Sequence, residues 1–280
     1  MDTISAKGYG FGYIGSVIPF AVIIYILMQA GIEDGLPIQA TKIGFLIVTV
    51  WWALLALPAM FHMKQRYHIE PSPSPVIDSF KRILKTLKEI KKHKQAFLFL
   101  AAYFFYIDGV GTIISMSTVY GRDLGFTITT LIGVIFFIQI VAFPFTLLYG
   151  KLAKIFSPKK MLLAGIGVYI FVTLFAFYLP SVDDLNIRIY AFWVISFLIA
   201  SSMGGVQALS RSYFGKLIPP EKSSEFFGFY NVFGKFAAIT GPFLMGLVGS
   251  ITGDTRWGVL SLLVLFIIGA VILTKVAEPE

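Results

Sequence analysis

The sequence predicts an all-α, polytopic membrane protein with about eight transmembrane helices. Its residues are 57% hydrophobic and only 14% charged, whereas an ordinary soluble domain carries about 25% charged residues. The mean hydropathy is +0.81, and apolar segments of about 20 residues, the length that crosses a bilayer, recur along the whole chain. The absence of cysteine excludes disulfides, iron–sulfur clusters and zinc–thiolate sites.

The eight predicted spans are separated by polar or basic connections. Gly31 to Pro37 ends the first span, and the long basic stretch 63–95 separates the second span from the third. Glycine and proline interrupt several spans, which membrane helices tolerate when neighbours satisfy the backbone. In order, the spans cover 9–30, 42–62, 96–118, 127–149, 160–180, 188–210, 224–249 and 256–275.

The basic residues predict the orientation of these spans. One set of alternate connections holds 18 lysines and arginines, and the opposite set holds four: Lys42, Arg122, Arg188 and Arg256. Cytoplasmic loops carry the excess of Lys and Arg. We therefore expect a multi-pass protein of the bacterial inner or cell membrane, with both termini in the cytoplasm.

The stretch 63–95 differs from the other connections. It contains PSPSP at 71–75, a stiff extended segment, followed by apolar residues at helical spacing among lysines. This pattern predicts a basic amphipathic helix at 77–94 that lies on anionic lipid of the inner leaflet. The stretch could instead be a plain connector, or it could dock partners. Nucleic acid is not an expected partner so close to the bilayer.

Two opposite charges fall deep inside spans. Asp108 lies in the third span and Lys235 in the seventh, both about 17–18 Å from the predicted inner end. A charge at the bilayer centre costs at least about 2.5–3.5 kcal/mol, so we expect the two side chains to pair. Such a pair could only hold two helices together, or it could bind a substrate, an ion or a proton.

Two further polar residues lie close to this predicted pair. Asn231 is four residues before Lys235, on the same helix face. Tyr106 is two residues before Asp108. Each is a candidate for binding a solute or an ion, and each could instead serve helix packing.

The end of the sixth span supplies candidates for a gate. Gln207 and Arg211 are four residues apart and share a face. Arg211 falls at the membrane interface, where it could pair with Glu221 or Glu225 across the next connection as an inner gate. Gln207 could face a cavity or hydrogen-bond a neighbouring helix.

Enzyme signatures are absent from the sequence. It contains no HExxH, no phosphate-binding glycine loop and no GxSxG elbow. Asp108 is the only acidic residue well inside a span, whereas an aspartyl protease needs two carboxylates. The three histidines, His62, His68 and His93, lie at or beside the basic stretch. We expect no catalytic activity, no cofactor and no metal site.

The arrangement of spans is asymmetric, with two spans, one basic linker and then six spans. Many transporters consist of two six-span halves joined by a cytoplasmic loop. We therefore expect 1–62 to be the last two helices of an incomplete N-terminal half, 63–95 to be the linker, and 96–280 to be a complete C-terminal half.

Several motifs resemble one branch of the major facilitator superfamily. They are SAKGYGFGYIG (5–15), YIDGVGTIISM (106–116), YGRDLGF (120–126) and the long block 204–246 that begins GGVQALSRSYFGKL. The branch is the "unidentified major facilitator" group, which is related to fungal vacuolar amino-acid effluxers linked to autophagy. The resemblance covers essentially the whole chain. It implies a twelve-helix fold in which these eight spans are helices 5–12, so that the sequence is truncated at its N-terminus.

The resemblance also implies a function. It predicts a secondary active transporter that moves a small solute, with amino acids as one class, by alternating access. Helices 7, 8, 10 and 11 would line the cavity and hold Asp108, Lys235, Asn231 and Gln207, with Arg211 at the inner gate. The absent N-terminal helices would be a partner. The alternative is an inactive truncated product, or a membrane scaffold that docks partners through its basic loop.

Overall fold

The computed structural model describes residues 1–32, 35–63, 74, 78, 81, 86 and 88–278. Within them the elements are helices, and eight helical segments are long and apolar enough to cross a membrane. This confirms the predicted all-α fold with about eight spans. The helices are α1 (Asp2–Ala30), α2 (Ile38–His62), α4 (Lys94–Asp123), α5 (Ile128–Phe156), α6 (Pro158–Tyr178), α7 (Leu185–Leu217), α8 (Ser223–Thr252), α9 (Thr255–Ser261) and α10 (Leu263–Thr274), with short 3-10 turns at Leu179–Ser181 and Pro220–Lys222.

Several helices extend beyond their predicted spans, and α5, for example, continues to Phe156 instead of ending at residue 149. The first helix begins at Asp2 instead of residue 9, and the sixth span continues to Leu217 instead of ending at residue 210. The predicted eighth span is divided at Leu262 into α9 and α10. Hydropathy marks only the part of a helix that lies in hydrocarbon, so it does not detect polar helix ends such as 211–217.

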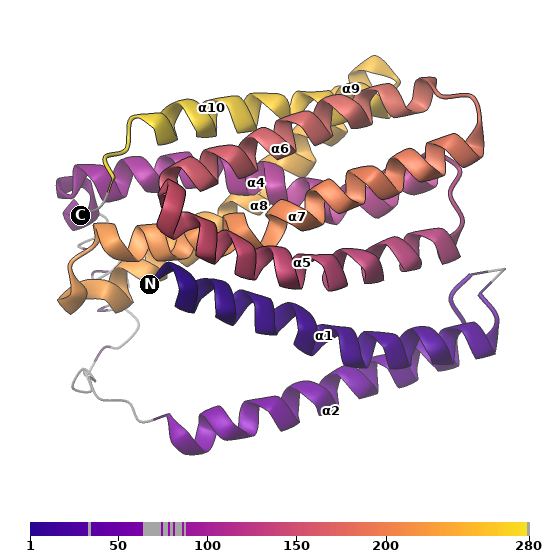
Figure 1. The fold of residues 1–280 in the computed structure, drawn as a ribbon, viewed down its shortest axis with the longest axis horizontal. Helices are drawn as coiled ribbons and strands as arrows, with labels where there is room; N and C mark the ends of the chain where they lie inside the picture. The colour runs from indigo at the N-terminus through magenta and orange to yellow at the C-terminus, as the bar shows by residue number, and fades with distance from the viewer. Residues whose placement is uncertain are drawn as a thin grey trace.

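The helices run side by side along the long axis of the molecule, and both chain ends lie at the same end of the bundle (Figure 1). We call this the terminal end. Helices α4 to α10 pack on one another, while α1 packs against α5 and α7. Helix α2 packs on α1 at the edge of the bundle (Figure 1).

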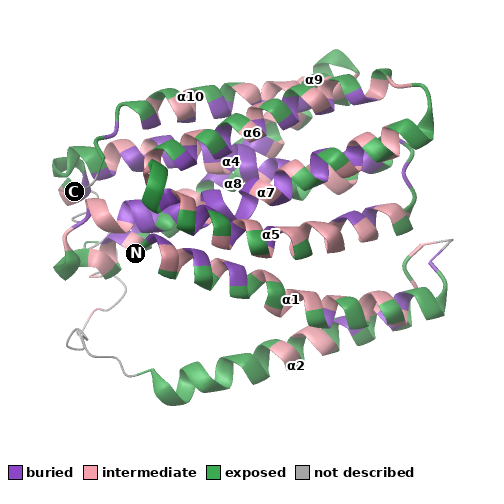
Figure 2. Ribbon diagram, in the orientation of Figure 1, coloured by how far each residue is buried: buried purple, intermediate pink, exposed green. Residues whose placement is uncertain are grey.

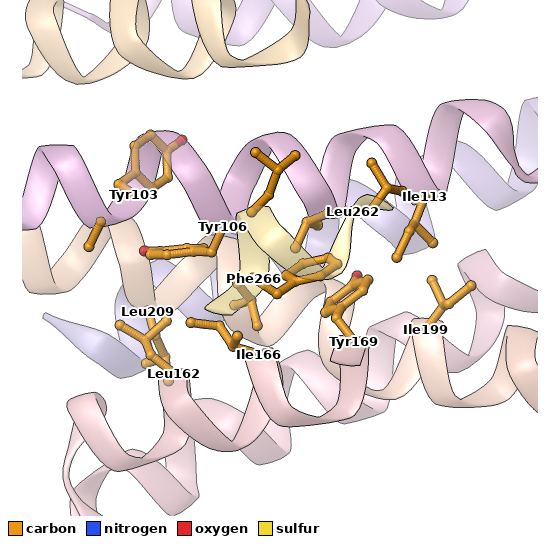
Figure 3. Packing of buried hydrophobic residues seen from close by; sticks show 14 of the residues in the cluster. Tyr103, Tyr106, Ile113, Leu162, Ile166, Tyr169, Ile199, Leu209, Leu262 and Phe266 are labelled. Atoms are coloured by element: carbon orange, nitrogen blue, oxygen red, sulfur yellow. The ribbon is translucent and has the colours of Figure 1, made fainter. Parts of the chain in front are cut away.

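The buried core lies among α4, α6, α7 and α10. Figure 2 shows buried positions gathered along the middle of the bundle and α2 exposed over most of its length. Phe266 of α10 stacks on Tyr169 of α6, with ring centroids 5.6 Å apart (Figure 3). Apolar exposure on α1 and α2 suits a helix in a bilayer, where lipid tails are as apolar as a leucine side chain.

Small residues permit the closest helix contacts. A Cβ at Gly109 would lie 2.6 Å from the Phe266 ring, and one at Gly121 would lie 2.6 Å from Leu131. Membrane helices associate by such close packing because no hydrophobic effect drives them together within lipid. The glycines of α4 therefore fix how near α10 and α5 can come.

The residues after α10 tie the terminal end together. The ammonium of Lys159 donates to the carbonyls of Thr274 and Val276, at 2.8 Å and 2.6 Å. The hydroxyl of Tyr213 on α7 donates to the carbonyl of Ala277 at 2.8 Å. The bond to Thr274 satisfies a carbonyl that the end of α10 leaves without an intrahelical partner, and the three bonds together connect α6 and α7 to the C-terminal residues.

The predicted basic linker is described only in part. The PSPSP segment, apart from Ser74, and much of the predicted amphipathic helix 77–94 lie outside the described residues. Residues 88–92 are helical, as predicted, and Lys88, Lys91 and Lys92 are exposed. Ile90 belongs to the apolar face that the amphipathic pattern predicts to lie on lipid, but it is fully buried in the protein core. Because Ile90 is part of the buried apolar cluster of the bundle, this end of the linker packs on the bundle.

Candidate functional site

Asp108 occupies an unusual environment at the middle of α4. Its side chain is fully buried. One carboxyl oxygen, Oδ1, accepts a hydrogen bond of 2.8 Å from the backbone N–H of Gly241 on α8. The hydroxyl of Thr112 donates to the backbone carbonyl of Asp108 at 2.8 Å and lies 3.5 Å from Oδ1. The second oxygen, Oδ2, is buried and has no hydrogen-bond partner among the described residues.

Gly241 makes this contact possible. A Cβ at position 241 would lie 2.7 Å from Oδ1 of Asp108 and would overlap the Thr112 hydroxyl. Pro242 follows inside the same helix, and proline removes one intrahelical hydrogen bond. Asp108 therefore contacts α8 at a residue without a side chain, next to a proline that leaves one backbone carbonyl of the helix without its hydrogen bond.

The predicted ion pair between Asp108 and Lys235 is wrong in this structure. The two residues form no salt bridge, and Lys235 is exposed, as is Asn231. Lys235 lies six residues before Gly241, which is about 9 Å along the helix and about 240° around it. Asp108 and Lys235 have similar predicted depths in the bilayer, but Lys235 faces a different side of α8 from Gly241, the residue that contacts Asp108.

Tyr106 lies in the core instead of on an open surface. Its hydroxyl is 2.6 Å from the hydroxyl of Ser210 on α7, and both residues are buried. Its ring meets Tyr103 edge to face at 5.7 Å, next to the core residues drawn in Figure 3. Tyr106 therefore joins α4 to α7 by a polar contact at depth.

The predicted gate residues are close in sequence but do not pair. Arg211 is exposed, and its guanidinium lies 5.8 Å from the ring centroid of Phe227. Glu225 accepts a hydrogen bond of 3.0 Å from the hydroxyl of Thr86 in the linker. The proposed contact of Arg211 with Glu221 or Glu225 is therefore wrong in this structure. Gln207, one turn before Arg211, is half-buried.

Arg211 borders a groove at the terminal end, between α1, α7 and the start of α8. The groove has a volume of about 540 Å³ and is also lined by Ser5, Tyr9, Ser223 and Phe227. The cation and the hydroxyls make this groove able to accept an anionic group.

A polar contact that the sequence patterns did not indicate joins α1 to α7. Asp2 accepts a hydrogen bond of 2.6 Å from the ammonium of Lys216 and one of 2.7 Å from the hydroxyl of Ser212. Nearby, the hydroxyl of Ser5 donates to the carbonyl of Ala208 at 2.7 Å. Hydropathy does not indicate this contact, because Asp2 precedes the predicted first span. The available signal is an acid and a base that flank two spans on the same predicted side of the membrane.

A second unexpected contact joins the linker to the connection between α7 and α8. Lys222 donates to Glu89 at 2.7 Å, beside the bond from Thr86 to Glu225. The start of α8 is therefore bonded to the linker residues that immediately precede α4.

The predicted binding residues do not form one pocket. Asp108 and Tyr106 lie in the core, Gln207 is half-buried, and Lys235, Asn231 and Arg211 are exposed. Among the residues that the structure describes, no three His, Cys, Asp or Glu side chains gather as a metal site. The arrangement offers a buried carboxyl on one side of α8 and exposed polar groups on another.

Comparison with known proteins identifies relatives over nearly the whole chain. A sequence model of the ATG22 family, described as "Vacuole effluxer Atg22 like", matches residues 1–279. The chain is 48% identical over 281 residues to the uncharacterized MFS-type transporter YxiO of Bacillus subtilis, a match that covers 99% of the chain and 64% of YxiO.

Fungal proteins are more distant relatives. Autophagy-related protein 22-1 of Penicillium rubens is 25% identical over 276 residues, which cover 90% of the chain and 45% of that protein. Autophagy-related protein 22 of Coccidioides immitis is 26% identical over 290 residues, which cover 94% of the chain and 46% of that protein. The chain thus spans about half to two thirds of the length of these relatives. It is a multi-pass integral membrane protein that belongs to the Atg22-like family of the major facilitator superfamily, as its motifs indicated.

Proposed function

We propose that the chain forms part of a secondary active transporter that moves a small solute by alternating access. Membership of the family and the similarity to an MFS-type transporter support this proposal. Amino acids are the solute class that we favour, since the motifs of the chain resemble those of fungal vacuolar amino-acid effluxers. A solute or proton gradient would drive the movement, because the sequence contains no nucleotide-binding motif.

The observation that carries this proposal is the exposure of Lys235 in the middle of α8. Lys235 is twelve residues from the start of the helix at Ser223, which is about 18 Å. A lysine that faced lipid at this depth would be costly, and intramembrane charges face a bundle interior or a water-filled cavity. The side of α8 that bears Asn231 and Lys235 therefore suits an aqueous path.

The chemistry of this side suits a solute with a carboxylate. Lys235 supplies a positive charge and Asn231 supplies an amide on the same helix face. Arg211 and the groove beside Tyr9 lie toward the terminal end. We propose that Lys235 and Asn231 bind the solute and that Arg211 and Gln207 lie along its path to that end.

The proposed moving parts are the two helix groups. Residues 1–62 would belong to an N-terminal half, 63–95 would be the linker, and 96–280 would form the C-terminal half, corresponding together to helices 5–12 of the family fold.

Helix α1 of the first group contacts α5 and α7 of the second group. Because polar contacts close this interface at Asp2 and Lys216, we propose that they form a gate. From the positive-inside bias we propose that this end is cytoplasmic and that the exposed lysines at 88–94 contact anionic lipid.

Flux measurement tests this function. The 280-residue chain is purified, reconstituted into vesicles and supplied with a pool of radiolabelled amino acids, with an imposed proton gradient. We expect gradient-dependent uptake that Lys235→Met abolishes and that Gly246→Ala, a change with no atom within 4 Å of the new Cβ, leaves intact. Flux that appears only when upstream helices are co-expressed would assign this chain a partner. Absence of flux in both preparations would favour a scaffold that acts through its basic loop.

A further inference from the structure

Asp108 is a buried ionisable group that solute binding at Lys235 and Asn231 does not explain. It is fully buried, no described residue pairs with it as a cation, and Oδ2 has no hydrogen-bond partner. Buried polar groups are nearly always bonded, so each exception needs a physical explanation. A carboxylate in this position would be an unpaired charge in a medium of low dielectric.

The elements packed around Asp108 offer it no charge. Helix α10 contains no titratable residue and presents the Phe266 ring to Gly109, next to Asp108. On α6, the hydroxyl of Tyr169 is itself buried without a partner. Tyr106 on α4 is bonded to Ser210 of α7. On α8, Lys235 is exposed, and Tyr230 stacks on Tyr103 at 4.2 Å. The hydrogen bonds to Asp108 come from Gly241 and Thr112 alone among the described residues.

This environment fits the neutral acid and disfavours the carboxylate. In the neutral acid, Oδ1 is a carbonyl oxygen that accepts a hydrogen bond from Gly241 N–H. The O–H on Oδ2 then has no acceptor among the described residues, but an unpaired neutral group costs less to bury than an unpaired charge. In the carboxylate, both oxygens carry charge, and one of them has no donor. Ionisation would therefore favour a conformation in which water reaches the carboxylate.

We propose that Asp108 is a proton-binding site that latches α8 to α4 when it is protonated and releases α8 when it ionises. The proton comes from the aqueous phase and binds a carboxyl oxygen. Its loss breaks only the O–H bond and leaves a buried charge that water solvates better than the single N–H of Gly241 does, so hydration of the carboxylate favours separation of α8 from α4. Pro242 gives α8 a weak point directly beside the latch.

The latch lies on the same helix as the exposed polar residues. A movement of α8 that separates Gly241 from Asp108 also displaces Asn231 and Lys235. If these residues bind the solute, which is the function proposed above, proton binding at Asp108 is coupled to the state of the solute site. The latch adds a proton-coupling step to the proposed transport function, but the test of the latch itself does not require a solute.

The absence of cysteine makes a distance measurement direct. Spin labels are attached to cysteines introduced at Arg122 of α4 and Ser250 of α8, which are exposed and lie near the ends of parallel helices. The distance between the labels is measured in lipid nanodiscs at about pH 5 and about pH 9. We expect one short distance at low pH and a second, longer distance at high pH.

Asp108→Asn is the decisive variant, because the amide keeps an oxygen for Gly241 N–H and cannot ionise. We expect it to hold the short distance at both pH values. Ser115→Ala removes an exposed hydroxyl of the same helix that bonds to a backbone carbonyl and is the matched control, for which the pH-dependent change should persist. As a second measurement, infrared difference spectra should show a protonated carboxyl band in the unmodified chain that Asp108→Asn removes.

Two results would overturn the latch. One is a label distance in the unmodified chain that does not change with pH; the other is a pH-dependent change that survives Asp108→Asn. Failure of the transport proposal has a different signature, since a pH-dependent distance without any flux would leave the latch standing and remove only its coupling to a solute.

Discussion

The carboxylate of Asp2 and the ammonium of Lys216 are 2.6 Å apart and connect the first residues of α1 to the last turn of α7. Ser212 adds a second bond to the same carboxylate. The side chains of Asp2 and Lys216 are 11% and 25% exposed, respectively. Water can therefore reach both groups and replace this contact when it opens. A bond that holds two helix groups at one end of a bundle, and that can be exchanged for water, suits a gate.

Removing one charge of this pair should open the terminal end. We expect Asp2→Asn to increase the rate at which a thiol reagent modifies a cysteine introduced at Tyr9, which lines the groove beside the pair. The charge exchange Asp2→Lys with Lys216→Asp should return the rate toward that of the unmodified pair. If each single variant and the exchanged variant react equally fast, the pair does not control access.

Substitution of Lys235 should affect transport and not stability. Because its side chain is exposed and unpaired with Asp108, Lys235→Met should change the free energy of unfolding by less than about 0.5 kcal/mol. Combination with Asp108→Asn should give additive changes, since the two residues do not contact each other. Thermal unfolding in detergent measures the stability change of each variant and the coupling energy between the two residues. A coupling energy well above about 0.5 kcal/mol would show that Asp108 and Lys235 do form an ion pair.

Gly241→Ala should disrupt the contact between α4 and α8. The new methyl group would press on Oδ1 of Asp108 and on the Thr112 hydroxyl, and such overpacking costs about 1–3 kcal/mol. Gly228→Ala on the same helix is the control, because its Cβ would meet no atom within 4 Å, and it should be neutral or stabilising. Thermal unfolding of the two variants side by side gives the comparison. Equal stability of both would show that α8 does not approach Asp108 this closely.

Tyr106→Phe should remove one interhelical hydrogen bond at depth. The bond to Ser210 should contribute roughly 0.6 kcal/mol, the average for such bonds between membrane helices. A double-mutant cycle with Ser210→Ala isolates this contribution. Tyr25→Phe, at a residue 65% exposed, is the matched control and should leave stability unchanged. A cycle with no coupling would mean that the two hydroxyls do not bond.

Exposed lysines in the last residues of the linker and at the first residue of α4 should attract anionic lipid. Replacing Lys88, Lys91, Lys92 and Lys94 by glutamine should weaken binding of phosphatidylserine roughly fivefold per lysine, since each nearby cation contributes about 1 kcal/mol. Lipid that remains bound after purification can be measured by mass spectrometry. Replacing Lys42, at the opposite end, should have no effect on lipid retention at the linker. Equal retention in both variants would contradict a lipid site at 88–94.

The positions of the spans could be predicted from the sequence because each needs about 20 apolar residues, which hydropathy detects. The packing partners could not. The helix α6, for example, is apolar on its lipid side and on its buried side alike, with Phe171 exposed and Ile166 buried, so the sequence does not distinguish the two faces. The same ambiguity explains the incorrect pairing of Asp108 with Lys235: depth follows from residue number, but the facing side depends on how α4 and α8 pack.

The hydrogen-bond and ion-pair partners at helix ends also could not be predicted from the sequence. Arg211 and Glu225 were expected to meet because they flank one connection, yet Glu225 bonds to Thr86 and Arg211 lies over Phe227. Several acceptors compete for each cation at a helix end, and sequence distance alone does not rank them. Asp2 lay outside the predicted spans and was assigned no role, although it makes the contact that joins α1 to α7.

The most direct test of the proposed transport cycle is flux through a chain in which the contact between α1 and α7 is reversibly locked. Asp2→Cys and Lys216→Cys are joined by a cross-linker with a reducible centre, in a chain that contains no other cysteine. We predict that vesicles with the cross-linked protein show no gradient-driven amino-acid uptake and that a reductant restores it. Uptake that is equal before and after reduction would contradict alternating access at this gate.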